Sequence, residues 1–131
     1  HQMPHIHAGI SKLIKDYGYR RLECFARTWD DESREFYRDL KIKVETSATM
    51  YTSVHYVIRS TSGTPSLTAE IQVRTLAEDL WGEVDHILNY PVPSNSKACR
   101  QQIRVLARLV STCTRLVDSI YDTVAEERDE S

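Results

Sequence analysis

The sequence predicts an α/β (α+β) fold in which a mixed β-sheet is flanked by helices and followed by a long C-terminal helix. Two patterns support this fold class. Short segments that alternate apolar and polar residues are typical of strands with one buried face, and longer segments with apolar residues every three or four positions are typical of amphipathic helices. A chain of 131 residues suffices for one domain with a substantial core, so residues 1–131 are interpreted as a single domain.

The three N-terminal histidines are predicted to lie in a loop. His1, His5 and His7 are not preceded by any strand or helix pattern. A metal site would need further ligands in a defined geometry, and no carboxylate stands near them in the sequence. We therefore favour a loop or an irregular chain end over a metal site, and the molecule could begin before His1.

The segments up to residue 74 predict one helix and four strands. From Ala8 the apolar spacing is helical, and Gly18 stands where a C-terminal glycine ends a helix. Period-two alternation predicts strands at 19–27, 41–45, 50–59 and 67–74. Between them, residues 29–34 predict a turn or a short helix start, and residues 46–49 predict a loop.

The last two strands could bring six functional side chains onto one face. A hairpin turn at Ser62 and Gly63 predicts three facing pairs: Tyr51 with Arg74, Ser53 with Gln72, and His55 with Glu70. A slip by two residues would keep all six on that face. A solvated sheet face is the ordinary alternative. An aromatic ring, an imidazole, a carboxylate, an amide and a guanidinium together instead favour the binding of a base, a ribose and phosphates.

A helix is predicted directly after these strands. Thr75 and Glu78 have the spacing of a capping box at its start. Its apolar stripe is expected to be buried and consists of Leu76, Leu80, Val84 and Ile87, with Trp81 as a further core residue. Polar residues lie on a neighbouring arc: Asp79, Asp85, His86 and Asn89. Gly82 costs about 1 kcal/mol relative to alanine inside a helix, which predicts a close contact there.

Residues 97–127 predict one long amphipathic helix. Its apolar residues recur in steps of three and four: Ile103, Leu106, Val110, Cys113, Val117, Ile120 and Val124. Such a stripe packs either on the chain's own sheet or against another subunit. We expect it to be buried mainly within the chain, with a homo-oligomer built from its edges.

Composition limits the classes of partner. The formal net charge is -2 and the pI is about 6.2, which does not favour binding to a DNA duplex. No apolar segment approaches the roughly 20 residues that a membrane span needs. The three cysteines form no ligand spacing and are odd in number, which fits a reducing compartment. We expect a cytoplasmic protein that binds neither DNA nor a membrane.

Three motifs, in this order, resemble those of the RelA/SpoT-type alarmone synthetases: Tyr51-Thr-Ser-Val-His55, Glu70-Ile-Gln-Val-Arg-Thr75, and Trp81-Gly-Glu-Val-Asp-His86 followed by Tyr90. The resemblance implies a nucleotidyltransferase-like mixed sheet. It also implies a pyrophosphokinase that transfers pyrophosphate from ATP to the 3′ hydroxyl of GDP or GTP. The products would be ppGpp and pppGpp, the stringent-response alarmones, and the cofactor would be Mg2+.

The resemblance also implies roles for individual residues. Glu70 would be the catalytic carboxylate, acting as general base on the 3′ hydroxyl or helping to hold magnesium. Tyr51 would stack on the acceptor guanine. The substrate-binding residues would be Tyr51, Ser53, His55, Gln72, Arg74, Asp79, Asp85 and His86. Of these, His55, Gln72 and Arg74 match positions near the ribose and phosphates, and Asp79 and Asp85 match positions near the base.

The family pattern is incomplete, mainly before the tyrosine motif. Met50, Ser47 and Pro91 replace a glycine and two lysines of the family. The family's magnesium-binding Asp-x-x-Gly-x-Arg strand has no counterpart, since Lys15 stands where the aspartate would precede Gly18. We therefore expect the C-terminal part of a longer synthetase rather than a remnant that lost its ATP-binding part. Two alternatives stay open: a toxic small synthetase that acts on tRNA 3′ ends or adenine nucleotides, and a non-catalytic guanine-nucleotide-binding module.

Overall fold

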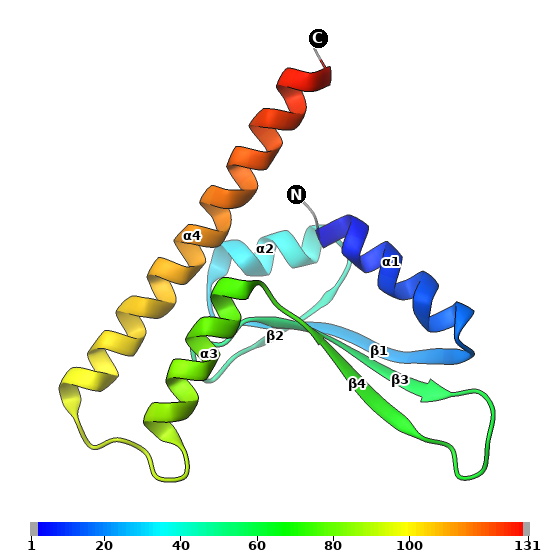
Figure 1. Ribbon diagram of the computed structural model, residues 1–131, viewed down its shortest axis with the longest axis horizontal. Helices are drawn as coiled ribbons and strands as arrows, with labels where there is room; N and C mark the ends of the chain where they lie inside the picture. Colours follow the sequence, from blue (N-terminus) through cyan, green and yellow to red (C-terminus); the bar gives the residue numbers. More distant parts are fainter. Residues whose placement is uncertain (1–2, 130–131) are drawn as a thin grey trace. The chain divides into compact units, whose positions relative to one another are not determined.

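The computed structural model describes residues 3–129, which fold as two compact units that meet in sequence between Val73 and Arg74 (Figure 1). The first unit contains α1 (Met3–Asp16), β1 (Tyr19–Thr28), α2 (Asp31–Asp39), β2 (Lys43–Thr46), β3 (Ser53–Ser60) and β4 (Thr68–Val73). The second unit contains α3 (Leu76–Asn89) and α4 (Lys97–Asp129).

The four strands form one mixed sheet in the order β2-β1-β3-β4. β1 pairs with β2 in parallel and with β3 antiparallel, and β3 pairs antiparallel with β4. The register of the β1–β3 pair shifts at a bulge between Arg21 and Glu23. The predicted α/β (α+β) class, with a mixed sheet, flanking helices and a long C-terminal helix, is confirmed.

One face of the sheet forms the hydrophobic core. Because side chains alternate along a strand, every second residue of β1, β3 and β4 points to this face. α1 and α2 cover it (Figure 1). The buried residues of this core are Met3, Ile14, Ala26, Ile42, Val54, Tyr56 and Ile58. The opposite face therefore receives the alternate residues, among them the polar residues Ser53 and His55 of β3 and Glu70 and Gln72 of β4.

The prediction of a loop around the N-terminal histidines is wrong for His5 and His7, because α1 begins at Met3. Met3 is buried in the core, and Pro4 is tolerated in the first turn of a helix, where its missing N–H has no intrahelical partner. His7 Nδ1 lies 2.8 Å from the hydroxyl oxygen of Tyr56. His1 lies outside the described residues. Within residues 3–129, no group of three His, Cys, Asp or Glu side chains is arranged to hold a metal ion.

The predicted register of the last hairpin is wrong by two residues. His55 faces Gln72, and Glu70 faces Val57. The cause is a wider loop: the ladder closes with the bond from Ser60 N to Leu67 O, 2.9 Å, so the turn is not the tight one expected at Ser62 and Gly63. A shift by two positions preserves the faces, because side chains alternate with a period of two.

The second unit is built on α3 and α4. Thr75 caps α3: its Oγ1 accepts from Glu78 N (3.2 Å), while Glu78 Oε2 accepts from Thr75 N (2.8 Å), which confirms the capping box. Trp81 is buried, as predicted, and its Nε1–H donates to Ile103 O of α4 at 3.0 Å.

No helix within the described residues has the length and apolarity to cross a membrane.

The predicted buried stripe of α3 is mostly wrong. Leu76, Leu80 and Ile87 are exposed, and Val84 is half-buried. The face of α3 that packs on α4 is centred on Trp81, which is the largest side chain of the helix, and the leucine stripe lies to one side of that face.

α4 begins at Lys97 as predicted and extends to Asp129. Only the first half of its predicted stripe is buried, at Ile103 and Val110, whereas Val117, Ile120 and Val124 are exposed. The expectation that this stripe is buried mainly within the chain therefore holds for the N-terminal half of the helix alone.

Candidate functional site

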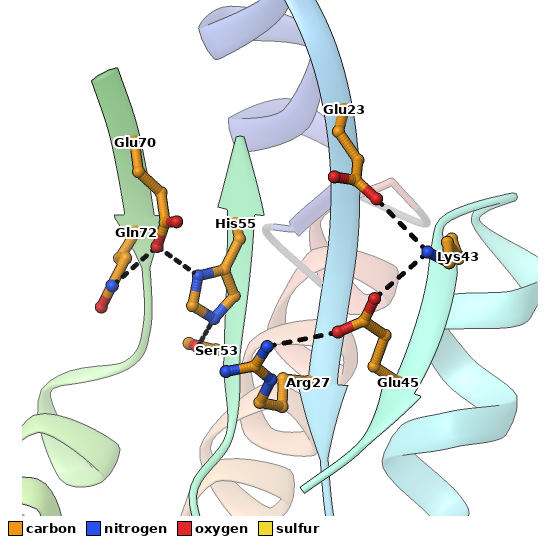
Figure 2. Close-up of polar contacts among 8 residues, drawn as sticks. All are labelled: Glu23, Arg27, Lys43, Glu45, Ser53, His55, Glu70 and Gln72. Atoms are coloured by element: carbon orange, nitrogen blue, oxygen red, sulfur yellow. Dashed lines mark hydrogen bonds and ion pairs between the residues drawn. The ribbon is translucent and has the colours of Figure 1, made fainter. Parts of the chain in front are cut away.

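The polar face of the sheet brings together five of the residues that the motifs single out. β3 places Ser53 and His55 on this face, and β4 places Glu70 and Gln72 beside them (Figure 2). Tyr51 stands just before β3 and reaches the same group through its hydroxyl, which donates to Gln72 Oε1 at 3.0 Å. Sequence reasoning predicted that these residues share a face, although with a different register.

His55 is the centre of this group. Its Nδ1 lies 2.6 Å from Glu70 Oε1, and its Nε2 lies 2.5 Å from Ser53 Oγ. An ionised carboxylate only accepts hydrogen bonds, so the proton stands on Nδ1, and in the neutral imidazole Nε2 then accepts from the Ser53 hydroxyl. His55 is 3% exposed and Ser53 is 0% exposed. The imidazole is therefore fixed in one orientation by a serine on one side and a glutamate on the other.

Phe25 supports the imidazole from β1. The two residues face each other in the β1–β3 register, and their rings stack with centroids 4.7 Å apart and an interplanar angle of 3°. The Arg27 guanidinium lies 5.5 Å from the Phe25 ring centroid, within the range of a cation–π contact. Both residues were missed at the sequence level. The alternation of Glu23, Phe25 and Arg27 places them on one face of the strand, but no local pattern sets that face beside His55.

Glu70 is a carboxylate held by donors and open to solvent. Gln72 Nε2 donates to the same Oε1 atom at 2.8 Å. The hydrogen bond from His55, and after it the hydrogen bond from Gln72, lowers the pKa of the Glu70 carboxyl. The Glu70 side chain is 42% exposed. Glu70 is therefore ionised at neutral pH, oriented, and accessible to a ligand.

A charged network continues along the same face to the β2 edge (Figure 2). Lys43 Nζ lies 3.1 Å from Glu45 Oε1 and 3.3 Å from Glu23 Oε1, and Arg27 pairs with Glu45 at 3.3 Å. Hydrogen bonds to Glu45 and then to Glu23 raise the pKa of Lys43, and those from Lys43 and then Arg27 lower the pKa of Glu45. Carboxylates and cations thus alternate along this face. The phosphate oxygens of a ligand could replace the carboxylates as the partners of Lys43 and Arg27.

The remaining candidate residues belong to the second unit. Arg74 Nε pairs with Asp79 Oδ1 at 3.1 Å. A Cβ on Gly82 would come within 3.2 Å of an Arg74 guanidinium nitrogen, so the glycine provides the space in which Arg74 lies along α3. This is the close contact that a glycine within the helix predicted.

Asp85 and His86 have neighbours of their own on α3. Asp85 Oδ1 accepts from Asn89 Nδ2 at 2.8 Å, and the rings of His86 and Tyr90 stack with centroids 4.8 Å apart. His86 is exposed. Within the second unit, the structure therefore pairs Arg74 with Asp79, Asp85 with Asn89, and His86 with Tyr90.

Comparison with known proteins identifies the family. The family model described as "Region found in RelA / SpoT proteins" matches residues 10–95 of the chain. Neither the curated proteins nor the solved structures gave a significant match. The matched region includes the whole polar face and all of α3, and it spans more than half of the chain. The chain belongs to the RelA/SpoT family of (p)ppGpp synthetase-like proteins.

Proposed function

We propose that the chain binds GDP or GTP as the acceptor of a pyrophosphate group that comes from ATP. The 3′ oxygen of the acceptor attacks the β-phosphorus of ATP, the bond from that phosphorus to the bridging oxygen of the α-phosphate breaks, and AMP leaves. The acceptor becomes ppGpp or pppGpp. Membership of the RelA/SpoT family supports this reaction class, and the carboxylate, imidazole and amide of the polar face are groups of the kind that such a transfer uses.

The observation that carries the proposal is the arrangement Ser53–His55–Glu70. Phosphoryl-type transfer depends mainly on positioning and on charge neutralisation, with a base beside the attacking hydroxyl. Glu70 Oε1 is occupied by donors from His55 and Gln72, and its side chain is 42% exposed. In our proposal the second carboxylate oxygen accepts the proton of the 3′ hydroxyl, and His55 holds the carboxylate in position.

Two acceptor contacts are assigned on the polar face. Tyr51 stacks on the guanine, because its ring stands just before β3 and its hydroxyl is anchored to Gln72. Gln72 orients the ribose through its amide. The residues of the second unit are assigned from the family motifs alone. Arg74, which pairs with Asp79, is assigned to the acceptor phosphates, and the residues assigned to the surroundings of the base are Asp79, Asp85 and His86.

Magnesium is proposed to arrive with the nucleotide phosphates. Within residues 3–129 no group of three potential ligands exists, and Lys43 already bridges Glu23 and Glu45. Magnesium commonly uses one or two protein carboxylates together with substrate phosphates, so Glu70 alone is compatible with such an ion. The ion would neutralise phosphate charge, and no step here is assigned to it.

The test compares wild type with Glu70→Gln in a transfer assay with γ-labelled ATP and GDP or GTP, resolved by thin-layer chromatography. Loss of a general base costs about 10²- to 10⁴-fold in rate, whereas folding and GDP affinity should change little because glutamine keeps the size and one acceptor. Glu83→Gln, on the exposed side of α3, is the matched control and should keep full activity. Transfer that survives in Glu70→Gln would remove Glu70 from the mechanism.

Two other outcomes would replace the proposed reaction. Binding of GDP without any transfer by the wild-type protein would indicate a guanine-nucleotide-binding module. Labelling of tRNA 3′ ends or of adenine nucleotides, with GDP and GTP inactive, would indicate a different acceptor, with Glu70 still acting as the general base.

A further inference from the structure

The polar face of the sheet continues past Glu70 toward the loop between β3 and β4. In the β1–β3 register Arg20 faces Arg59, and in the β3–β4 register Arg59 faces Thr68. Residues that face each other across a ladder point to the same side of a sheet, and so do alternate residues of one strand. Arg59 and His55 are separated by an even number of positions on β3, so this row lies on the polar face. We call Arg20, Arg59 and Thr68 the arginine row.

The bulge in β1 gives Arg20 its place on this face. The pairing of β1 with β3 skips Leu22, so Arg20 and Glu23 lie on the same side of the sheet although they are an odd number of positions apart. Arg21 points to the other side, where its Nη1 donates to Ser11 Oγ of α1 at 3.4 Å. The contact of Arg21 with a helix of the core face therefore agrees with the placement of Arg20 on the polar face.

The two arginines of the row are exposed like charges. Like charges that stand directly opposite each other destabilise a sheet. The other cations of this face, Arg27 and Lys43, are both paired with Glu45. Within residues 3–129, by contrast, the side chains of Arg20 and Arg59 form neither an ion pair nor a hydrogen bond. An unneutralised pair of guanidinium groups that costs the sheet stability favours a role in binding an anion.

The arginine row is adjacent to the carboxylate of the candidate site. Glu70 faces Val57, so Arg59 is a diagonal neighbour of Glu70, and such neighbours lie about 7–8 Å apart. A guanidinium group presents parallel N–H donors that match two oxygens of a phosphate. The exposed hydroxyl of Thr68 adds one more donor at the end of the row. Two guanidinium groups and a hydroxyl in one row suit a chain of several phosphates.

We propose that Arg20 and Arg59 bind the phosphate chain of a nucleotide, with Thr68 as a further donor. The assignment to a nucleotide rests on the proposed function, in which Gln72 orients the ribose and Glu70 accepts the proton of the 3′ hydroxyl. Gln72, Glu70 and Thr68 follow one another on one face of β4, so the arginine row comes directly after Glu70. The hydroxyl at Glu70 attacks a phosphorus, and the phosphates around that phosphorus need cations beside the carboxylate. The donor and the acceptor both carry a phosphate chain, and the row recognises the chemistry that they share.

The first experiment measures the binding of inorganic tripolyphosphate by calorimetry in magnesium-free buffer. Arg20→Gln and Arg59→Gln should each weaken binding about tenfold, because a hydrogen bond to a charged group contributes on the order of that factor. Arg38→Gln is the matched control, since Arg38 is exposed on α2, which covers the opposite face of the sheet, and this variant should bind like wild type. A wild-type protein that does not bind tripolyphosphate, or a double variant that binds it as tightly as wild type, would overturn the proposal.

The second experiment identifies the source of the phosphate chain. α,β-Methylene ATP keeps the triphosphate but cannot transfer pyrophosphate, because a methylene group replaces the oxygen at the bond that breaks. A loss of affinity in Arg20→Gln and Arg59→Gln that is confined to α,β-methylene ATP assigns the row to the donor, and a loss confined to GDP assigns it to the acceptor. Unchanged binding of both nucleotides, with tripolyphosphate binding lost, would refute the assignment to a nucleotide. None of these measurements requires transfer, so a protein that makes no ppGpp still tests the arginine row.

Stability gives a third readout, which a merely structural role of the arginines would not produce. Replacement of one of two facing like charges should leave the urea midpoint of the first unit unchanged or raise it at low salt. Tripolyphosphate should raise the midpoint of wild type and leave that of the double variant in place, because a ligand stabilises the folded state that binds it. If tripolyphosphate raises both midpoints equally, the anion binds elsewhere and the proposal fails.

Discussion

Ser53→Ala removes one buried oxygen and leaves the imidazole of His55 without a partner at Nε2. Ser53 is 0% exposed and His55 is 3% exposed, so water cannot replace the lost hydroxyl without a rearrangement. A tautomer change does not help, because it would place an unprotonated Nδ1 against the Glu70 carboxylate and leave Nε2–H unpaired. A buried polar group left unsatisfied costs about 1–3 kcal/mol. We expect the free energy of unfolding of the first unit to fall by about 2 kcal/mol.

Urea denaturation followed by circular dichroism measures this loss. Ser66→Ala is the matched control, because Ser66 is exposed in the loop between β3 and β4 and should change stability by less than about 0.5 kcal/mol. If Ser53→Ala is no more destabilising than Ser66→Ala, the hydrogen bond between Ser53 Oγ and His55 Nε2 does not exist in solution. The mechanism would then lose the contact that fixes the imidazole.

Two further predictions concern tyrosines on the two faces of the sheet. Stacking of a base on an aromatic ring is worth roughly 1–3 kcal/mol, so Tyr51→Ala should weaken GDP binding by about one to two orders of magnitude in calorimetry, and Tyr51→Phe should bind nearly normally. An unchanged affinity for Tyr51→Ala would assign this ring to packing. On the core face, burial raises the pKa of Tyr56 to about 12, above its ordinary value of 10. Between these values the unfolded chain releases the proton and the folded chain keeps it, so stability should fall as pH rises from 10 to about 12. Tyr56→Phe should flatten this fall in a pH series of urea denaturations, and an equally steep fall in the variant would exclude Tyr56 as its source.

The residues of the polar face were predictable because they depend on a local pattern. Alternation along β3 and β4 places Ser53, His55, Glu70 and Gln72 together in any register that shifts by an even number. The register itself depends on the width of the loop, which no local pattern determines. Phe25 was missed for another reason: its contact with His55 arises from the pairing of β1 with β3, which are distant in the sequence.

The helices show the same division between local and distant information. The capping box of α3 was predicted from Thr75 and Glu78, since a cap is a contact within one turn. The buried face of α3 was not, because the leucine stripe and the face of Trp81 are both plausible apolar surfaces and only the partner helix selects between them. The start of α1 depended on the burial of Met3, which the sequence does not reveal.

The central claim is that a guanine-nucleotide acceptor binds on the face that carries His55 and Glu70. NMR of protein labelled with ¹⁵N at histidine measures this directly, with the His55 ring signals assigned from a His55→Gln variant. GDP should shift the His55 ring signals in wild type, and CDP should leave them unchanged at the same concentration. GDP binding that calorimetry detects while the His55 signals stay in place would contradict the claim.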